Sequence, residues 1–164
     1  MHQVHLSLGS NIQPEVNLPR AIKLLWEYGE ILQVSSAWES EAVGSDGPNF
    51  LNACALLVTP IAEIELKEKV IHPIETKLGR KRSADKNAPR SIDIDAILFD
   101  DRPLNNKFWK QAFVVVPLAE IHPEFQNPIT RENIMETATR LRQAVWMEAR
   151  PGVLAPFNGA RSKS

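Results

Sequence analysis

The order in which strand-like and helix-like patterns follow one another constrains the fold of this chain more than any other feature. Residues 2–8 alternate polar and apolar side chains, which indicates a strand with one buried face, and the turn residues Gly9–Asn11 end it. Apolar residues then recur at helical spacing, with Asn17 as the expected N-cap and Gly29 as the expected stop. The chain is therefore expected to begin with a strand and a helix.

Two further strands and a second helix are expected next. Residues 31–38 and 50–58 have the composition of strands and are separated by a loop rich in turn residues. Thr59 and Pro60 predict the start of a helix that ends near Leu78. Pro73 lies inside this helix and should kink it, because proline cannot donate the backbone hydrogen bond.

A fourth alternating pattern, over residues 91–99, completes the order strand, helix, strand, strand, helix, strand. This order predicts the α+β class and a ferredoxin-like sandwich, in which helices pack on an antiparallel sheet. A short apolar segment follows over 112–116. A further helix is expected over 134–142 and a last strand over 144–148.

Length and composition limit the class of protein. The 164 residues suit a single domain, expected over 1–156, with a polar, frayed tail over 157–164. No run approaches the roughly 18 apolar residues of a membrane span and no secretory signal pattern is present, so a cytoplasmic address is expected. The net charge of −1 argues against general attraction to nucleic acid, and the single cysteine, Cys54, rules out a disulfide framework within the chain.

Two aspartates in the last alternating pattern indicate a metal site. In the segment Arg90-Ser91-Ile92-Asp93-Ile94-Asp95, the acidic residues are two apart, and residues at that spacing on a strand project from the same face. Two carboxylates this close repel each other unless a cation lies between them. Mg²⁺ suits such a pair, because it commonly takes one or two carboxylates together with phosphate and water oxygens.

A basic segment directly precedes these aspartates. Residues 77–90 contain six cations against one acid: Lys77, Arg80, Lys81, Arg82, Lys86 and Arg90. Arginine matches the geometry of phosphate oxygens, so the basic segment and the paired acids supply the parts that phosphoryl transfer needs. Two plainer interpretations stay open, since a basic run is typical of a solvated face and alternating acids are typical of the wet side of a sheet.

Five segments, in this order, resemble the 6-hydroxymethyl-7,8-dihydropterin pyrophosphokinases. The segments are Leu8-Gly9-Ser10-Asn11, Phe50-Leu51-Asn52, Gly79-Arg80, Pro89 to Asp95 and Phe113 to Ile121. The resemblance covers roughly residues 4–123 and implies a ferredoxin-like fold. It also implies an enzyme of folate biosynthesis that transfers diphosphate from ATP to the hydroxymethyl group of the pterin and releases AMP. ATP and 6-hydroxymethyl-7,8-dihydropterin would be its small-molecule partners, and the chain is expected to be a monomer.

The resemblance also implies roles for residues in the nucleotide half of the site. Asp93 and Asp95 would be metal ligands for two Mg²⁺ ions. The catalytic residues would be these two aspartates together with Arg80 and Arg90, which would stabilise charge on the transferred group and on AMP. The residues expected to bind ATP are Glu75, Arg80, Arg82, Arg90 and Lys110.

A second set of residues would bind the pterin, again by resemblance: Ser40, Val43, Phe50, Asn52 and Phe113. The two phenylalanines would stack on the flat ring, although plain core packing is an equally simple interpretation of them. Asn52 lies in an apolar strand, where a polar amide must find hydrogen-bond partners.

The chain departs from the family pattern on the ATP side. Asn87 stands where tryptophan is common, residues 99–113 are shorter and contain no histidine, and Gln111 stands where arginine is common. The candidate substitutes are Lys107, Trp109 and Lys110. The departures motivate an alternative, a degenerate, non-catalytic paralogue that binds pterin or nucleotide. A purely structural module is a third possibility, but it leaves the Arg90–Asp95 motif without a role.

Overall fold

The computed structural model describes residues 1–42, 46–81 and 88–158. Its centre is a seven-stranded antiparallel sheet in the order β6-β5-β1-β4-β3-β7, with β2 also paired to β4. The strands are β1 (His2–Ser10), β2 (Glu30–Val34), β3 (Ala37–Ser40), β4 (Phe50–Thr59), β5 (Asp93–Phe99), β6 (Arg102–Pro103) and β7 (Met147–Arg150). The predicted ferredoxin-like α+β class is confirmed.

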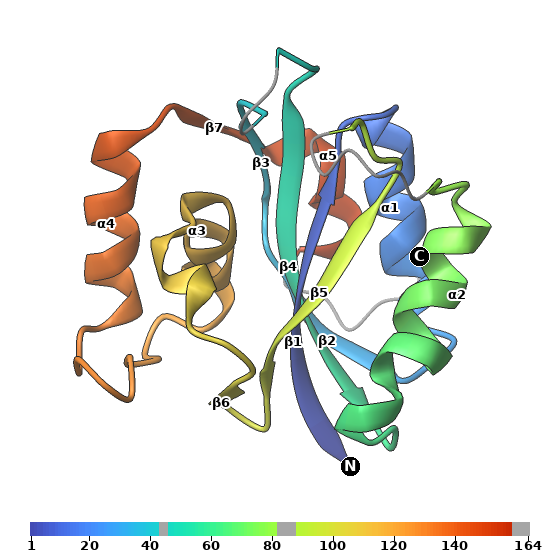
Figure 1. Cartoon of the computed structure of the whole chain (residues 1–164), viewed down its shortest axis with the longest axis horizontal. Coiled ribbons are helices and arrows are strands. Elements are labelled where there is room, and N and C mark those ends of the chain that lie inside the picture. The colour runs from blue at the N-terminus through green and yellow to red at the C-terminus, as the bar shows by residue number, and fades with distance from the viewer. Residues whose placement is uncertain (43–45, 82–87, 159–164) are drawn as a thin grey trace.

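Helices cover both faces of the sheet (Figure 1). The α-helices are α1 (Pro14–Leu25), α2 (His72–Lys77), α3 (Ala112–Ile121), α4 (Ile134–Ala144) and α5 (Pro151–Leu154). Short helical turns are η1 (Glu63–Glu65), η2 (Lys67–Ile71), η3 (Lys107–Lys110) and η4 (Ala155–Phe157). One face carries α1, α2 and α5, and the other carries α3 and α4 (Figure 1). Within the described ranges, no helix has the length and apolar character needed to cross a membrane.

The alternation expected in the first strand sends successive side chains of β1 to opposite faces of the sheet. Val4, Leu6 and Leu8 are fully or almost fully buried in the core beneath α1 and α2. Each such burial contributes about 2 kcal/mol of hydrophobic stabilisation. His5 and Ser7 project from the opposite face, where the His5 ring stacks on that of His122 just after α3. The polar positions His5 and Ser7 are therefore buried as well, on the face that carries the cavity described below, whereas Gln3 is exposed.

The first helix begins earlier than predicted. It starts at Pro14, whose fixed φ suits the first helical turn, so the expected N-cap at Asn17 is wrong. The Asn17 side chain instead donates to the carbonyl of Ile12 at 2.6 Å and holds the preceding loop. The helix also ends at Leu25, before Gly29. Glycine is needed at position 29 because a Cβ there would lie 2.1 Å from the carbonyl oxygen of Val58.

The strand expected over 31–38 is two strands. β2 and β3 are separated at Ser35, which bonds Cys54 of β4 twice: its N–H donates to the Cys54 carbonyl, and its hydroxyl accepts from the Cys54 N–H, both at 2.9 Å. The break leaves β3 free to pair with β7 on its outer side. β7 begins at Met147, later than the strand expected over 144–148.

The helical segment after β4 is less regular than the single helix expected from Thr59. Thr59 is the last residue of β4, and its hydroxyl accepts a hydrogen bond from the N–H of Ile61 at 3.2 Å. The segment then consists of η1, the π-helical turn η2 and α2. In η2 the N–H of His72 donates to the carbonyl of Lys67, five residues back. This wide turn directly precedes Pro73, which has no N–H to donate, and it accommodates the proline where a kink was expected.

The apolar segment at 112–116 is the first half of α3, a ten-residue helix. Most of its residues are buried between the sheet and α4, so its sequence lacks the one-sided apolar pattern that identifies a surface helix. The tail also differs from its prediction at two positions. Phe157 is buried at 3% exposure, and the Asn158 amide donates to two carbonyls near the end of β2, so these two residues are not frayed. The rest of the expected tail lies outside the described residues.

The buried histidine in β1 should make stability depend on pH. Burial, followed by repulsion from His122, lowers the pKa of His5 from 6.5 to about 4, although Asp101 acts in the opposite direction. The unfolded chain therefore binds more protons between these two pH values, and the free energy of unfolding should fall by about 3 kcal/mol as the pH drops through them. Urea denaturation at several pH values measures this. His5→Gln should make the free energy of unfolding depend less on pH in this range. If the variant shows the same pH dependence as the unaltered protein, the dependence does not come from His5.

Candidate active site

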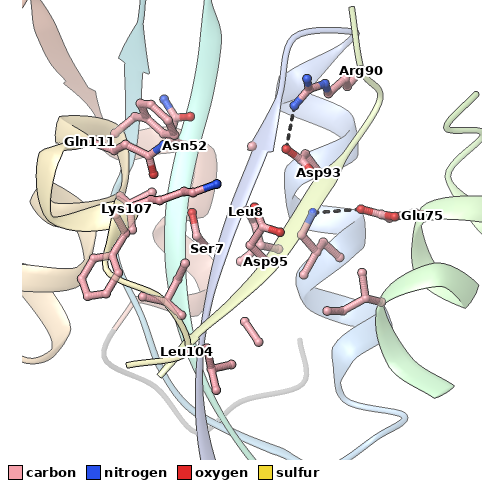
Figure 2. Close-up of a pocket in the computed structure, with 18 of the residues that line it drawn as sticks. Ser7, Leu8, Asn52, Glu75, Arg90, Asp93, Asp95, Leu104, Lys107 and Gln111 are labelled. Carbon is pink, nitrogen blue, oxygen red and sulfur yellow. Dashed lines mark hydrogen bonds and ion pairs between the residues drawn. The ribbon is translucent and has the colours of Figure 1, made fainter. Parts of the chain in front are cut away.

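A cavity of about 1280 Å³ opens over the middle of the sheet. Residues of β1, β4 and β5 form its floor, and its walls come from the segment η1 to α2, which belongs to one face of the sheet, and from η3 and α3, which belong to the other. Figure 2 shows this arrangement, with Lys107 and Gln111 on one wall, Asp93 and Asp95 on β5, and Glu75 on the far side. Most of the residues expected to act on the two substrates line this one cavity.

The strand register places the polar residues in rows across the floor. Gly9 of β1 pairs with Asn52 of β4 on one side and with Asp93 of β5 on the other. Ser7, one step along the same face, pairs with Asp95. A Cβ at position 9 would lie 3.3 Å from the Asn52 side-chain oxygen, so glycine leaves the floor open between the amide and the carboxylate. Ser7 also lines the cavity, although the sequence analysis did not select it.

The two aspartates share the cavity, as their spacing predicted. Asp93 bonds both arginines: Arg80 Nη1 lies 3.0 Å from one carboxylate oxygen, and Arg90 Nη1 lies 2.8 Å from the other. Desolvation by the surrounding protein raises the pKa of Asp95, and repulsion from Asp93 and Glu75 raises it further. A cation bound between the aspartates would relieve this repulsion, because it stabilises the charged form of both.

Glu75 is buried at 3% exposure and reaches the outer edge of β5. One carboxylate oxygen accepts from the N–H of Ile94 at 3.0 Å (Figure 2) and from Arg80 Nη1 at 2.5 Å. It therefore joins α2 to the edge of the strand that carries both aspartates, and it fixes the guanidinium of Arg80 beside Asp93. This geometry favours a positioning role for Glu75 over the direct contact with ATP that the resemblance implied.

The residues expected to bind the pterin lie at the other end of the cavity. The Asn52 amide donates to the Ser40 hydroxyl at 2.8 Å and to the Trp38 carbonyl at 3.1 Å, so this buried amide is held by two partners. Phe50 from β4 and Phe113 from α3 are half-buried and both line the cavity. Val43 lies outside the described residues, as does Arg82 on the nucleotide side.

Of the three candidate substitutes on η3, which are Lys107, Trp109 and Lys110, only Lys107 lines the cavity. Lys110 is exposed and does not line the cavity, whereas Lys107, three residues earlier, does. Trp109 belongs to the core, because its ring is 8% exposed and stacks between Phe108 and Phe125. The tight turn of η3 sends neighbouring side chains in different directions, and sequence proximity alone could not tell them apart.

Paired carboxylates backed by two arginines, next to a pocket with an amide and aromatic rings, are typical of enzymes that transfer phosphoryl groups from a nucleotide. Comparison with known proteins makes this class specific. The model of the 7,8-dihydro-6-hydroxymethylpterin-pyrophosphokinase family matches residues 5–123. The chain belongs to this family.

Curated relatives agree with this assignment. The chain is 36% identical over 146 residues to 2-amino-4-hydroxy-6-hydroxymethyldihydropteridine pyrophosphokinase of Aquifex aeolicus. The matched region covers 83% of this chain and 90% of the relative. It is 34% identical over 164 residues to the enzyme of the same name from Synechocystis, with 93% and 83% covered. The Bacillus subtilis enzyme of that name is 30% identical over 149 residues, with 84% and 88% covered.

Solved structures share the fold. An HPPK-DHPS structure in complex with substrates superposes with a TM-score of 0.66 at 13% identity, covering 87% of this chain and 44% of that one. The wild-type HPPK-DHPS of Plasmodium falciparum with pteroate superposes with a TM-score of 0.66 at 12% identity. This match covers 87% of this chain and 42% of that one. The chain thus spans less than half the length of these solved chains.

Proposed function

We propose that this chain transfers the β,γ-diphosphate of ATP to the hydroxymethyl oxygen of 6-hydroxymethyl-7,8-dihydropterin and releases AMP. As a member of its family the chain is a pyrophosphokinase of folate biosynthesis. One observation carries the proposal: a single cavity is lined by Asp93 and Asp95 with two arginines at one end and by Asn52, Phe50 and Phe113 at the other. A cytoplasmic address and a monomeric state are part of the proposal.

The donor set at the nucleotide end fits Mg²⁺. Asp93 and Asp95 offer hard carboxylate oxygens from one face of β5, and Mg²⁺ commonly takes one or two protein carboxylates and completes its shell with phosphate and water. Within the described residues no cluster of three or more acidic, histidine or cysteine side chains is placed to hold a metal, so phosphate oxygens would supply the other ligands. Mg²⁺ held there, expected as two ions, would neutralise the phosphates and acidify the attacking hydroxyl.

The protein's own side chains stabilise the charge that develops during transfer and orient the substrate. The pterin oxygen attacks the β-phosphorus and forms a new P–O bond, the bond from the β-phosphorus to the bridging oxygen of AMP breaks, and the hydroxyl proton passes to solvent water. Arg80 and Arg90 lie where they can stabilise the negative charge on the transferred group and on AMP. Both now bind Asp93, so binding of nucleotide exchanges the Asp93 carboxylate for phosphate oxygens as their partner. Asp95 remains to orient the hydroxyl.

A direct assay tests the proposal. AMP should form when the protein, ATP, Mg²⁺ and the pterin are present together, and should not form when either the pterin or the metal is left out. AMP release independent of the pterin would instead identify an ATP-hydrolysing activity. A folded protein that binds pterin but forms no AMP would overturn the proposal and favour a non-catalytic binding protein.

The buried amide gives a test of pterin recognition. The N–H groups of Asn52 donate to Ser40 and Trp38, which leaves its side-chain oxygen, next to Gly9, to accept from the amide edge of a pterin. Asn52→Ala should weaken pterin binding by about tenfold or more, because a desolvated hydrogen-bonding edge of the ligand loses its partner. Asn49→Ala is the matched control, since Asn49 bonds Glu39 and does not line the cavity. Equal effects of both changes on the pterin Kd would remove Asn52 from the pterin site.

A further inference from the structure

The wide π-helical turn places a lysine at the edge of the cavity. Lys67 is the first residue of η2, is exposed, and lines the cavity on the wall that leads to α2. Its positive charge acts on Asp95 across the cavity. Lys69, two residues later, instead forms an ion pair with Glu65 and does not line the cavity. Lys67 itself has no such ion pair within the residues that the structure describes. π-helical turns are frequently found at functional sites, where the extra residue redirects a side chain.

A second lysine faces this one from the opposite wall. The Lys107 side chain extends from η3 into the cavity between Asn52 and Asp95 (Figure 2). Its ammonium, too, forms no ion pair with any other described side chain. Lys110, at the other end of η3, points away from the cavity.

The charges around the aspartates explain why further cations are needed. Three carboxylates gather at this end of the cavity, those of Glu75, Asp93 and Asp95, and the described arginines Arg80 and Arg90 are bonded to that group. Before Mg²⁺ binds, these acids outnumber the two described arginines, so this group alone would repel a triphosphate. The lysines on the two walls reverse the sign of the local charge and leave cationic donors free for phosphate oxygens.

We infer that Lys67 and Lys107 hold the phosphate chain of the nucleotide from opposite walls of the cavity, on either side of Asp95. The inference rests on the proposed function, adds Lys67 to it and gives the candidate substitute Lys107 a defined role. An ammonium serves here as a mobile point charge that follows the phosphates during transfer, whereas Arg80 is held in place by Glu75. Both lysines are thereby assigned to the nucleotide.

Matched substitutions test this inference. The variants Lys67→Met and Lys107→Met remove a cavity cation, and Lys69→Met and Lys110→Met remove a neighbouring lysine that does not line the cavity. Titration calorimetry with Mg²⁺ and α,β-methylene-ATP should show the Kd rising about tenfold for each cavity variant and less than about twofold for each control. Lys67→Arg should restore most of the affinity. The Kd for the pterin should stay unchanged in all five proteins.

The outcomes separate the two proposals. If the unaltered protein does not bind Mg²⁺ and α,β-methylene-ATP, the proposed function itself fails. If it binds them and both cavity variants bind equally well, only the role of the two lysines fails. A similar loss in the cavity variants and in their controls would point to a general effect of net charge and would also overturn the inference. Because all four lysines are exposed, thermal melting should confirm that every variant is folded.

Discussion

Asp95→Ala is expected to lower the rate of AMP formation by about a thousandfold or more, as expected when a charge that acts on the transition state is removed. The carboxylate lies on the cavity floor beside Asp93, which is already bonded to two arginines. No other described carboxylate on this face of β5 can replace it. Binding of the pterin should largely survive, because Asn52 and the two phenylalanines lie at the other end of the cavity.

Two measurements decide this prediction. AMP release gives kcat, and quenching of intrinsic fluorescence by the pterin gives its Kd. Asp46→Ala is the matched control, since Asp46 is an exposed acid that does not line the cavity. If a folded Asp95→Ala protein loses pterin binding together with activity, Asp95 belongs to the pterin site and its role as a metal ligand is wrong. The variant should also become more stable at neutral pH, because the raised pKa of Asp95 shows that its charge is unfavourable in the folded state.

Glu75→Ala should have the second largest effect, on stability and activity together. The Glu75 carboxylate is buried, and its loss leaves Arg80 and the N–H of Ile94 without the partner that now holds them. Breaking a buried ion pair from one side typically costs about 3 kcal/mol, and the free energy of unfolding should fall by about that amount. The KM for ATP should rise as well, since Arg80 is no longer fixed beside Asp93.

A double-mutant cycle separates the ion pair from the hydrogen bond to the strand. The free energy of unfolding is measured in urea for Glu75→Ala, Arg80→Ala and the double variant. The double variant should be more stable than the sum of the single losses predicts, because it leaves no uncompensated buried charge. Glu75→Gln keeps an acceptor for Ile94 and should lose less than Glu75→Ala. Additive losses would show that Glu75 acts through the strand edge alone.

Local patterns predicted the parts of this protein that depend on local periodicity. The alternation in β1 correctly placed Val4, Leu6 and Leu8 on one face, and the spacing of Asp93 and Asp95 correctly predicted a shared face. A register shift between β1 and β5 interrupts the alternation later in β5, where Ile97, Leu98 and Phe99 are buried in succession. Helix starts and fully buried segments were harder to predict from local patterns. Asn17 has the composition of an N-cap, but Pro14 starts the helix a turn earlier. The apolar run that begins α3 carries no periodicity, because it is buried on nearly all sides.

By itself the sequence determined the order of elements as far as β5, with β2 and β3 taken as one strand, the pair of aspartates on one face and the family to which the chain belongs. These follow from spacings of two to four residues and from motifs that are read along the chain. Only the tertiary structure decided that Glu75 caps the edge of β5, that Asp93 bonds both arginines, and that Lys67 faces the cavity while Lys69 does not. The physical reason is that periodicity fixes the face of an element on which a side chain lies, whereas its partner depends on which distant element packs against that face.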